Sequence, residues 1–147
     1  MFAARGLPPV TQAASRPAVL VVDDVADTRK LLAQFLQRQG FDTLQAADGE
    51  EGLLALRGNR TRICTVVLDL IMGGMNGWTF RERQLADPSL ASIPVVILTH
   101  ARRSDLLRAA LKVKDVLYKP VSSEELIAAI HRHCVGWGLN DAEQREI

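Results

Sequence analysis

Five polar residues of this sequence could act together chemically: Asp23, Asp24, Asp69, Thr99 and Lys119. Each stands at the end of an apolar run, within the stretches "VLVVDD", "TVVLDL", "VVILT" and "VLYK". An apolar run of this length predicts a buried strand. A buried carboxylate without a partner is energetically costly, so acids in these places indicate a cation or metal ion beside them.

The residue types favour phosphoryl chemistry at a magnesium site. Carboxylates held close together raise one another's pKa unless a cation intervenes, and Mg²⁺ prefers oxygen ligands of this kind. Lys119 and Thr99 would add an ammonium and a hydroxyl group, which can offset the charge on phosphoryl oxygens. Asp69 could then act as the nucleophile.

The surrounding sequence predicts alternating strands and helices. We expect strands at Ala18–Val22, Asp42–Gln45, Ile63–Leu68, Pro94–Leu98 and Val116–Tyr118. Between and after them, apolar stripes at helical spacing predict helices around Leu31–Leu36, Glu50–Leu56, Gly77–Ala86 and Ser104–Leu111, and a last one after Pro120. The capping-box pattern of Ser122 and Glu125 marks the start of that helix.

This alternation predicts an α/β fold with right-handed βαβ connections and a five-stranded parallel sheet between two helical layers. We expect the flavodoxin-like, doubly wound order 2-1-3-4-5, in which the first and third strands are neighbours. Ligands of such sheets bind at the carboxyl ends of the strands. All five polar residues are predicted to lie at that edge.

Composition favours one globular domain in the cytoplasm. Of the 147 residues, 48% are hydrophobic and 24% are charged, and the net charge of +1 gives no attraction to nucleic acid or to a membrane surface. We expect a flexible leader over residues 1–17, a domain over 18–135 and a polar tail over 136–147. Cys64 and Cys134 form no C-x-x-C pattern, so we expect two reduced thiols.

The stretches "VLVVDD", "VVLDLIMGGMNG", "IPVVILT" and "YKP", in this order, resemble the receiver domain of two-component response regulators, in particular the stand-alone regulators of chemotaxis. The resemblance spans about Ala18–Cys134. It implies that Asp69 accepts a phosphoryl group from a histidine kinase or a phosphotransfer protein. It further implies that Lys119–Pro120 is a cis peptide.

The resemblance also implies roles for the other residues. Mg²⁺ would be bound directly by Asp24, Asp69 and the backbone carbonyl of Ile71, and through water by Asp23. Thr99 and Lys119 would contact the phosphoryl oxygens. Such a protein is not an enzyme beyond phosphorylating and dephosphorylating itself.

We expect the signal to pass by protein–protein contact, because no output domain fits in the residues outside the receiver-like region. The expected partners are a downstream protein and a second copy of the chain. In this family they bind at the fourth helix, the fifth strand and the fifth helix, which here correspond to Ser104–Leu111, Val116–Tyr118 and the helix after Pro120.

Two departures from the family pattern leave a second function open. Val116 stands where the family usually has an aromatic residue, and we expect the nearby Tyr118 on the opposite face of its strand. His100 replaces a small residue after Thr99. A receiver-like adaptor that binds partners regardless of phosphorylation is therefore the alternative.

Two other chemistries are less well supported by the sequence. A phosphatase of the haloacid dehalogenase type needs a second Asp two residues after the nucleophile, where this chain has Ile71. The stretch "HRHC" at His131–Cys134 offers too few ligands on one helix face for a zinc site.

Overall fold

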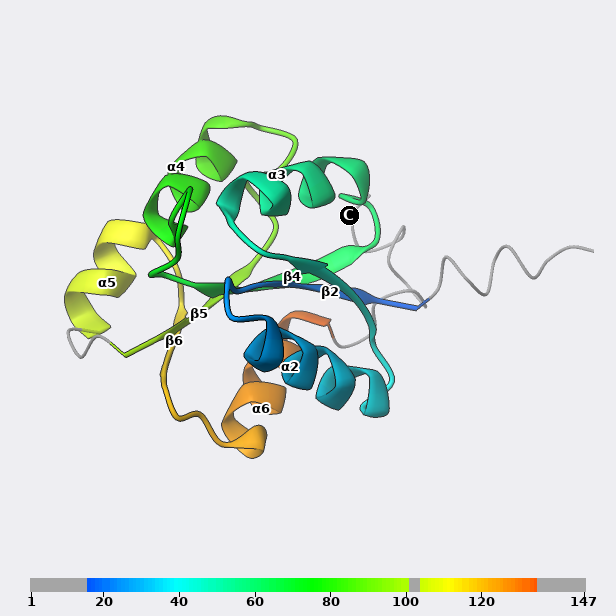
Figure 1. The fold of residues 1–147 in the computed structure, drawn as a ribbon. Helices are drawn as coiled ribbons and strands as arrows, with labels where there is room; N and C mark the ends of the chain where they lie inside the picture. The colour runs from blue at the N-terminus through cyan, green and yellow to red at the C-terminus, as the bar shows by residue number, and fades with distance from the viewer. Residues whose placement is uncertain (1–15, 101–103, 135–147) are drawn as a thin grey trace, which may run out of the picture.

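The structure is a computed structural model that describes residues 16–100 and 104–134. A five-stranded parallel sheet forms its centre (Figure 1), with the strands in the order β3-β2-β4-β5-β6. The strands are β2 (Ala18–Val22), β3 (Asp42–Ala46), β4 (Ile63–Asp69), β5 (Val95–Thr99) and β6 (Asp115–Tyr118). The predicted fold class and strand order 2-1-3-4-5 are thus confirmed.

Five helices cover the two faces of the sheet. They are α2 (Ala26–Arg38), α3 (Gly49–Gly58), α4 (Gly77–Ala86), α5 (Ser104–Leu111) and α6 (Ser123–Cys134). In Figure 1, α3, α4 and α5 lie on one side of the sheet, and α2 and α6 lie on the other. Each face of the sheet therefore has its own apolar cluster.

Local signals in the sequence account for several helix ends. Asp48 and Asn76 cap α3 and α4, because their side chains accept hydrogen bonds from the backbone N–H groups three residues on. At the start of α6, the Ser122 hydroxyl accepts from the Glu125 N–H at 3.0 Å. The main chain turns after α2 at Gly40, whose φ of 99° suits glycine.

The helices bury narrower stripes than the sequence suggests. Leu31 and Leu106 were expected on buried stripes but are 66% and 57% exposed. Trp78 of α4 is also 41% exposed, although its side chain is large and apolar. Phe80, two residues further along α4, is fully buried instead. Because these helices rest on a sheet along one side only, residues at the border of the apolar stripe remain in solvent.

A disulfide bond joins Cys64 of β4 to Cys134 at the end of α6. The expectation of two reduced thiols is therefore wrong for this structure, and a zinc site involving Cys134 is ruled out with it. The two residues are 70 positions apart in sequence, but α6 packs across β4 and brings their Cα atoms to 5.4 Å. A disulfide that depends on tertiary packing in this way cannot be predicted from a local sequence pattern.

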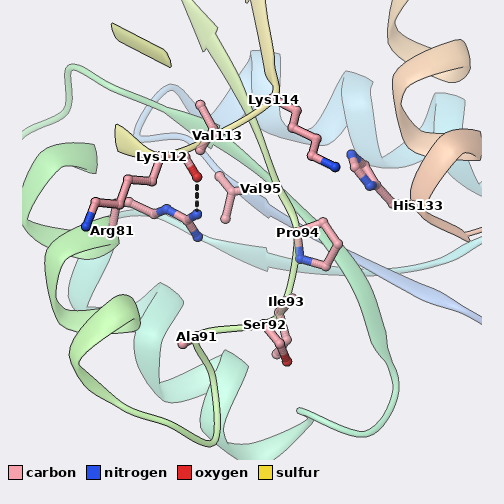
Figure 2. Close-up of a pocket in the computed structure, with 10 residues that line it drawn as sticks. All are labelled: Arg81, Ala91, Ser92, Ile93, Pro94, Val95, Lys112, Val113, Lys114 and His133. Atoms are coloured by element: carbon pink, nitrogen blue, oxygen red, sulfur yellow. Dashed lines mark hydrogen bonds between the residues drawn. The ribbon is translucent and has the colours of Figure 1, made fainter. Parts of the chain in front are cut away.

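A buried arginine ties α4 to the segment that follows α5. The Arg81 side chain donates hydrogen bonds to the backbone carbonyls of Leu111 and Lys112 and to the Gln84 side chain. Figure 2 shows the bond to Lys112 at the edge of a pocket that also includes Val95 and His133. Burial lowers the pKa of the Arg81 guanidinium. Its charge is placed at the carboxyl end of α5, where a cation stabilises the helix.

A buried acid holds the end of α6 on the first residue of β6. The Asp115 carboxylate, 7% exposed, binds the Arg132 guanidinium and lies 2.7 Å from Nε2 of His133. Burial acts to raise the pKa of Asp115, but the bonds from Arg132 and His133 outweigh it and hold the pKa below 3.8. A lowered pKa means that the ionised carboxylate stabilises the fold.

Asp115→Asn is therefore expected to lower the free energy of unfolding at neutral pH by about 1–3 kcal/mol. Because the folded-state pKa is depressed, the stability that Asp115 contributes is present above pH 3.8 and is lost as the pH falls through the lower folded value. Urea unfolding at several pH values should show the two proteins converging in acid. A difference that stays constant into acid would contradict this role.

Candidate functional site

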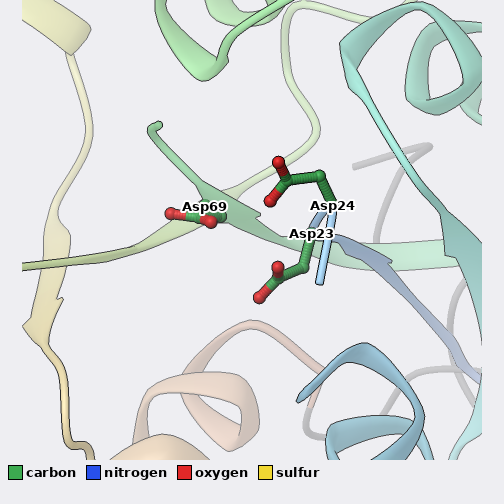
Figure 3. Close-up of side chains that lie close together, drawn as sticks. All are labelled: Asp23, Asp24 and Asp69. Carbon is green, nitrogen blue, oxygen red and sulfur yellow. The ribbon is translucent and has the colours of Figure 1, made fainter. Parts of the chain in front are cut away.

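Three carboxylates meet at the carboxyl edge of the sheet. Figure 3 shows Asp23, Asp24 and Asp69 turned toward a common space, and one oxygen atom of each lies within 4.8 Å of the others. Asp23 and Asp69 are buried, whereas Asp24 is exposed. The cluster is therefore closed toward the protein and open toward solvent.

The sheet places these acids by direct backbone pairing. β2 pairs with β4 so that Val22 lies beside Leu68, which brings the ends of the two strands together. Asp69 in turn pairs with Leu98 of β5. The strand that carries Asp69 is therefore held on both sides.

Lys119 lies between two of the carboxylates. Its Nζ atom is 3.6 Å from Oδ2 of Asp23 and 3.5 Å from Oδ2 of Asp69. Its backbone N–H donates to the Thr99 carbonyl at 2.9 Å, which fixes the end of β6 against the end of β5. The peptide bond to Pro120 is cis, as predicted. Thr99 is buried at the same edge.

Opposing effects act on the Asp69 carboxyl group. Burial raises its pKa, the Lys119 ammonium lowers it, and the Asp23 carboxylate raises it again. The net result is a pKa above the ordinary value of 3.8. Lys119 thus does not fully offset the effect of burial, to which the Asp23 charge adds.

The donor set fits a hard divalent cation such as Mg²⁺. Oδ2 of Asp23 is buried and accepts no hydrogen bond, so the lysine at 3.6 Å is its nearest charged partner. The Asp24 carboxylate is oriented by the Gly73 N–H, which donates to Oδ2 at 3.0 Å. All side-chain donors of the cluster are oxygens, the ligand atoms that Mg²⁺ binds with several of its waters retained.

Two glycines position parts of the site, a role that the sequence did not reveal. Gly73 supplies the N–H that holds Asp24, and Gly77 begins α4 directly against the end of β4. The Gly77 N–H donates to the Leu70 carbonyl at 2.9 Å. The sequence signal for these positions is the glycine-rich stretch "GGMNG" at Gly73–Gly77, which follows the strand that carries Asp69.

The sequence profile of the response regulator receiver domain matches residues 19–131. This stretch is most of the chain and contains every residue of the acidic cluster. The chain belongs to the response regulator receiver family.

Individual relatives are consistent with this assignment. The DNA-binding response regulator MtrA of Mycobacterium tuberculosis is 34% identical over 119 residues, which are 78% of this chain and 49% of MtrA. The chain thus matches about half the length of the MtrA relatives. Protein PilH of Pseudomonas aeruginosa is 28% identical over 80% of this chain and 98% of its own length.

A solved structure shows the same architecture. A chain of the CheX–CheY–BeF3–Mg²⁺ complex from Borrelia burgdorferi superposes with a TM-score of 0.71 at 27% identity, covering 79% of this chain and 87% of that chain. In the part of this receiver that the structure describes, no helix is long and apolar enough to cross a membrane.

One prediction about the receiver's fifth strand is wrong. Tyr118 was expected on the opposite face from Val116, but both side chains belong to the apolar cluster beneath α3, α4 and α5. Side chains two residues apart in a strand share a face, and Leu117 between them packs on the other side. An aromatic ring is therefore present on the face where receivers usually carry one, two residues closer to the lysine.

Proposed function

We propose that this receiver is a phosphorylation-controlled signalling protein in which Asp69 accepts the phosphoryl group. The observation that carries the proposal is the convergence of Asp23, Asp24 and Asp69 around Lys119 at the carboxyl edge of the sheet. Asp69 belongs to the central strand and is 9% exposed, so its carboxylate is both fixed and reachable. The donor is a phosphohistidine on a histidine kinase or a phosphotransfer protein.

The transfer exchanges one bond to phosphorus for another. An Asp69 oxygen attacks the phosphorus atom, the P–N bond to the donor histidine breaks, and its electron pair stays on the imidazole nitrogen. Lys119 offsets negative charge on the transferred oxygens, and the Thr99 hydroxyl binds one of them. The Lys119 ammonium, now 3.5 Å from Asp69, is already in place for this task.

Asp24, Asp69 and the Ile71 carbonyl would hold Mg²⁺, with Asp23 acting through a bound water. When bound, the ion supplies positive charge that lets the carboxylates and the phosphoryl group lie close together. Asp23 also orients the site directly: its Oδ1 accepts the Val25 N–H at 2.9 Å, so the chain leaving β2 is fixed beside Asp24.

The deciding experiment is incubation with Mg²⁺ and a small phosphodonor such as acetyl phosphate, followed by intact-mass measurement. The wild type is expected to gain the mass of one phosphoryl group, and Asp69→Asn is expected to gain none, because its amide cannot act as the nucleophile. Asp27→Asn is the matched control, since Asp27 is exposed in the first turn of α2. Equal labelling of Asp69→Asn and the wild type would refute the assignment.

We further propose that the protein acts in the cytoplasm through a downstream protein target, with residues 18–135 as the signalling domain, residues 1–17 as a leader and residues 136–147 as a tail. Both α5 and α6, together with β6, offer the surface for that target or for a second copy. Leu106 of α5 projects from this surface with 57% of its area exposed.

A receiver-like adaptor that ignores phosphorylation remains the second candidate. It is favoured by Val116, a buried aliphatic residue at the usual aromatic position, and by the exposed His100 beside Thr99. Comparing the affinity of a captured partner for labelled and unlabelled protein separates the two functions. A switch binds the two forms differently, and an adaptor binds them equally.

A further inference from the structure

The Cys64–Cys134 disulfide lies at the opposite end of β4 from Asp69 and takes no part in the proposed phosphoryl transfer. It joins the second residue of β4 to the last residue of α6. In the cytoplasm, where we propose the protein acts, lasting disulfides are rare and those that form are usually transient, in catalysis or redox sensing. This location raises the question whether the bond can open and close in the folded protein.

The fold can accommodate Cys64 and Cys134 as two free thiols. Sγ of Cys64 lies 3.5 Å from the Ala18 carbonyl oxygen, so a Cys64 thiol would have a hydrogen-bond acceptor beside it once the two sulfur atoms separate. Both cysteines belong to the apolar cluster beneath α2 and α6, an environment that suits neutral thiols. A free Cys64 thiol therefore has a hydrogen-bond acceptor, and a free Cys134 thiol would lie among apolar side chains.

Other contacts hold α6 when the covalent bond is absent. Leu126 and Ile130 are buried in the same cluster. Asp115 binds both Arg132 and His133, which directly precede Cys134. Loss of the disulfide would therefore loosen the last turn of α6 without releasing the helix.

A hollow of about 440 Å³ adjoins Cys64 and gives a reductant its approach. Ser92, Pro94 and His133 line this hollow and also the neighbouring pocket of Figure 2. Cys64 itself has no exposed surface and Cys134 is 5% exposed. Attack on the bond thus requires the last turn of α6 to move outward, and helix ends open most readily.

The positive charge that lines the hollow favours one kind of reductant over another. Arg60 lines it and is exposed, and the other titratable wall residue, His133, is paired with Asp115. Among the residues that the structure describes, no acidic one lines the hollow. A thiol that carries negative charge is therefore attracted, and a cationic thiol is not.

We propose that Cys64 and Cys134 form a reversible thiol–disulfide site, reduced by small anionic thiols that enter through this hollow, and that its state controls how firmly the last turn of α6 is held on the sheet. A thiolate attacks Sγ of Cys64, forming a mixed disulfide, and Cys134 leaves as a thiolate that takes a proton from water. A second thiolate attacks the sulfur of the bound thiol. The small disulfide departs and Cys64 is protonated, so two thiols have supplied two electrons.

The first test counts thiols in the native wild type. Before reduction, iodoacetamide is expected to modify neither cysteine. After treatment with glutathione under native conditions, it should modify both, and oxidised glutathione should restore the unreactive form. Modification of untreated protein, or reduction that requires denaturant, would overturn the proposal.

The second test measures selectivity by charge. Reduction by glutathione is expected to be several-fold faster than reduction by the cationic thiol cysteamine at equal thiolate concentration, because the hollow is basic. Arg60→Gln should remove most of this preference, whereas Arg83→Gln, which lies outside the hollow, should keep it. Equal rates for the two thiols in the wild type would refute entry through this hollow.

The third test asks what reduction changes. Reduced wild type and Cys134→Ser are expected to stay folded, with faster amide exchange in the last turn of α6 and a melting temperature lower by roughly 10 °C. Either global unfolding of the reduced protein or unchanged amide exchange in the last turn of α6 would contradict the proposal. None of these readouts involves Asp69, so a failed phosphoryl-transfer experiment leaves them valid.

Discussion

Gly77→Ala is expected to slow phosphorylation of Asp69 by about 10- to 100-fold, although Gly77 would not touch the phosphoryl group. A Cβ atom at this position would lie 2.8 Å from the Asp69 carbonyl oxygen and 2.8 Å from the Leu70 Cα atom. Both obstacles are backbone, so the end of β4 or the start of α4 must shift. The free energy of unfolding is expected to fall by about 1–3 kcal/mol as well.

The measurement is the rate of mass increase with acetyl phosphate, together with urea unfolding. Gly58→Ala is the matched control, because it also lies in a helix but nothing lies within 4 Å of its added Cβ. That control is expected to keep the wild-type rate. If Gly77→Ala is phosphorylated at the wild-type rate, the close packing at Gly77 does not position Asp69.

Phe80→Ala is expected to have the largest effect on stability, a loss of about 3–5 kcal/mol in the free energy of unfolding. Phe80 has no exposed surface. Its ring lies against Gly52 of α3, where an added Cβ would come within 3.0 Å of the ring and 3.1 Å of Val22. Removing the ring would leave a cavity between α3, α4 and the sheet. Such a loss is a large part of the 5–15 kcal/mol typical of a domain.

Trp78→Ala offers the matched comparison within the same helix. Its indole is larger but 41% exposed, so its removal is expected to cost less than about half as much. Urea unfolding monitored by circular dichroism compares the two variants directly. Similar losses would mean that Trp78 carries more of the packing than its exposure indicates.

The strands and their order could be predicted because buried parallel strands are recorded in the sequence as short, continuous apolar runs. "AVLVV" and "ICTVVLD" are fully buried and form β2 and β4, the second and third strands of the sheet. The helices were also expected in their places, down to the bounds of Gly77–Ala86 and Ser104–Leu111. Which residues on the border of a helical stripe reach the core depends on the tilt of the helix on the sheet, and the chain does not encode that locally.

The meeting of the acids could be predicted for a different reason. Once the strands are parallel, residues at their carboxyl ends share one edge, so Asp23, Asp24 and Asp69 must converge. The disulfide had no such rule behind it, because the depth and direction of α6 decide whether Cys134 reaches Cys64. The shared face of Val116 and Tyr118, by contrast, follows directly from the two-residue repeat of a strand.

The position of β4 in the sheet has a mechanical consequence. β4 is the middle strand, and β3 and β6 are the two edge strands of the described sheet. A change at Asp69 reaches the β6 edge through the Lys119 ammonium, which follows β6 and lies 3.5 Å from the carboxylate, whereas β3 is bonded to the sheet only through β2. Displacements that begin at Asp69 are therefore expected to be larger at β6 and its flanking helices than at β3.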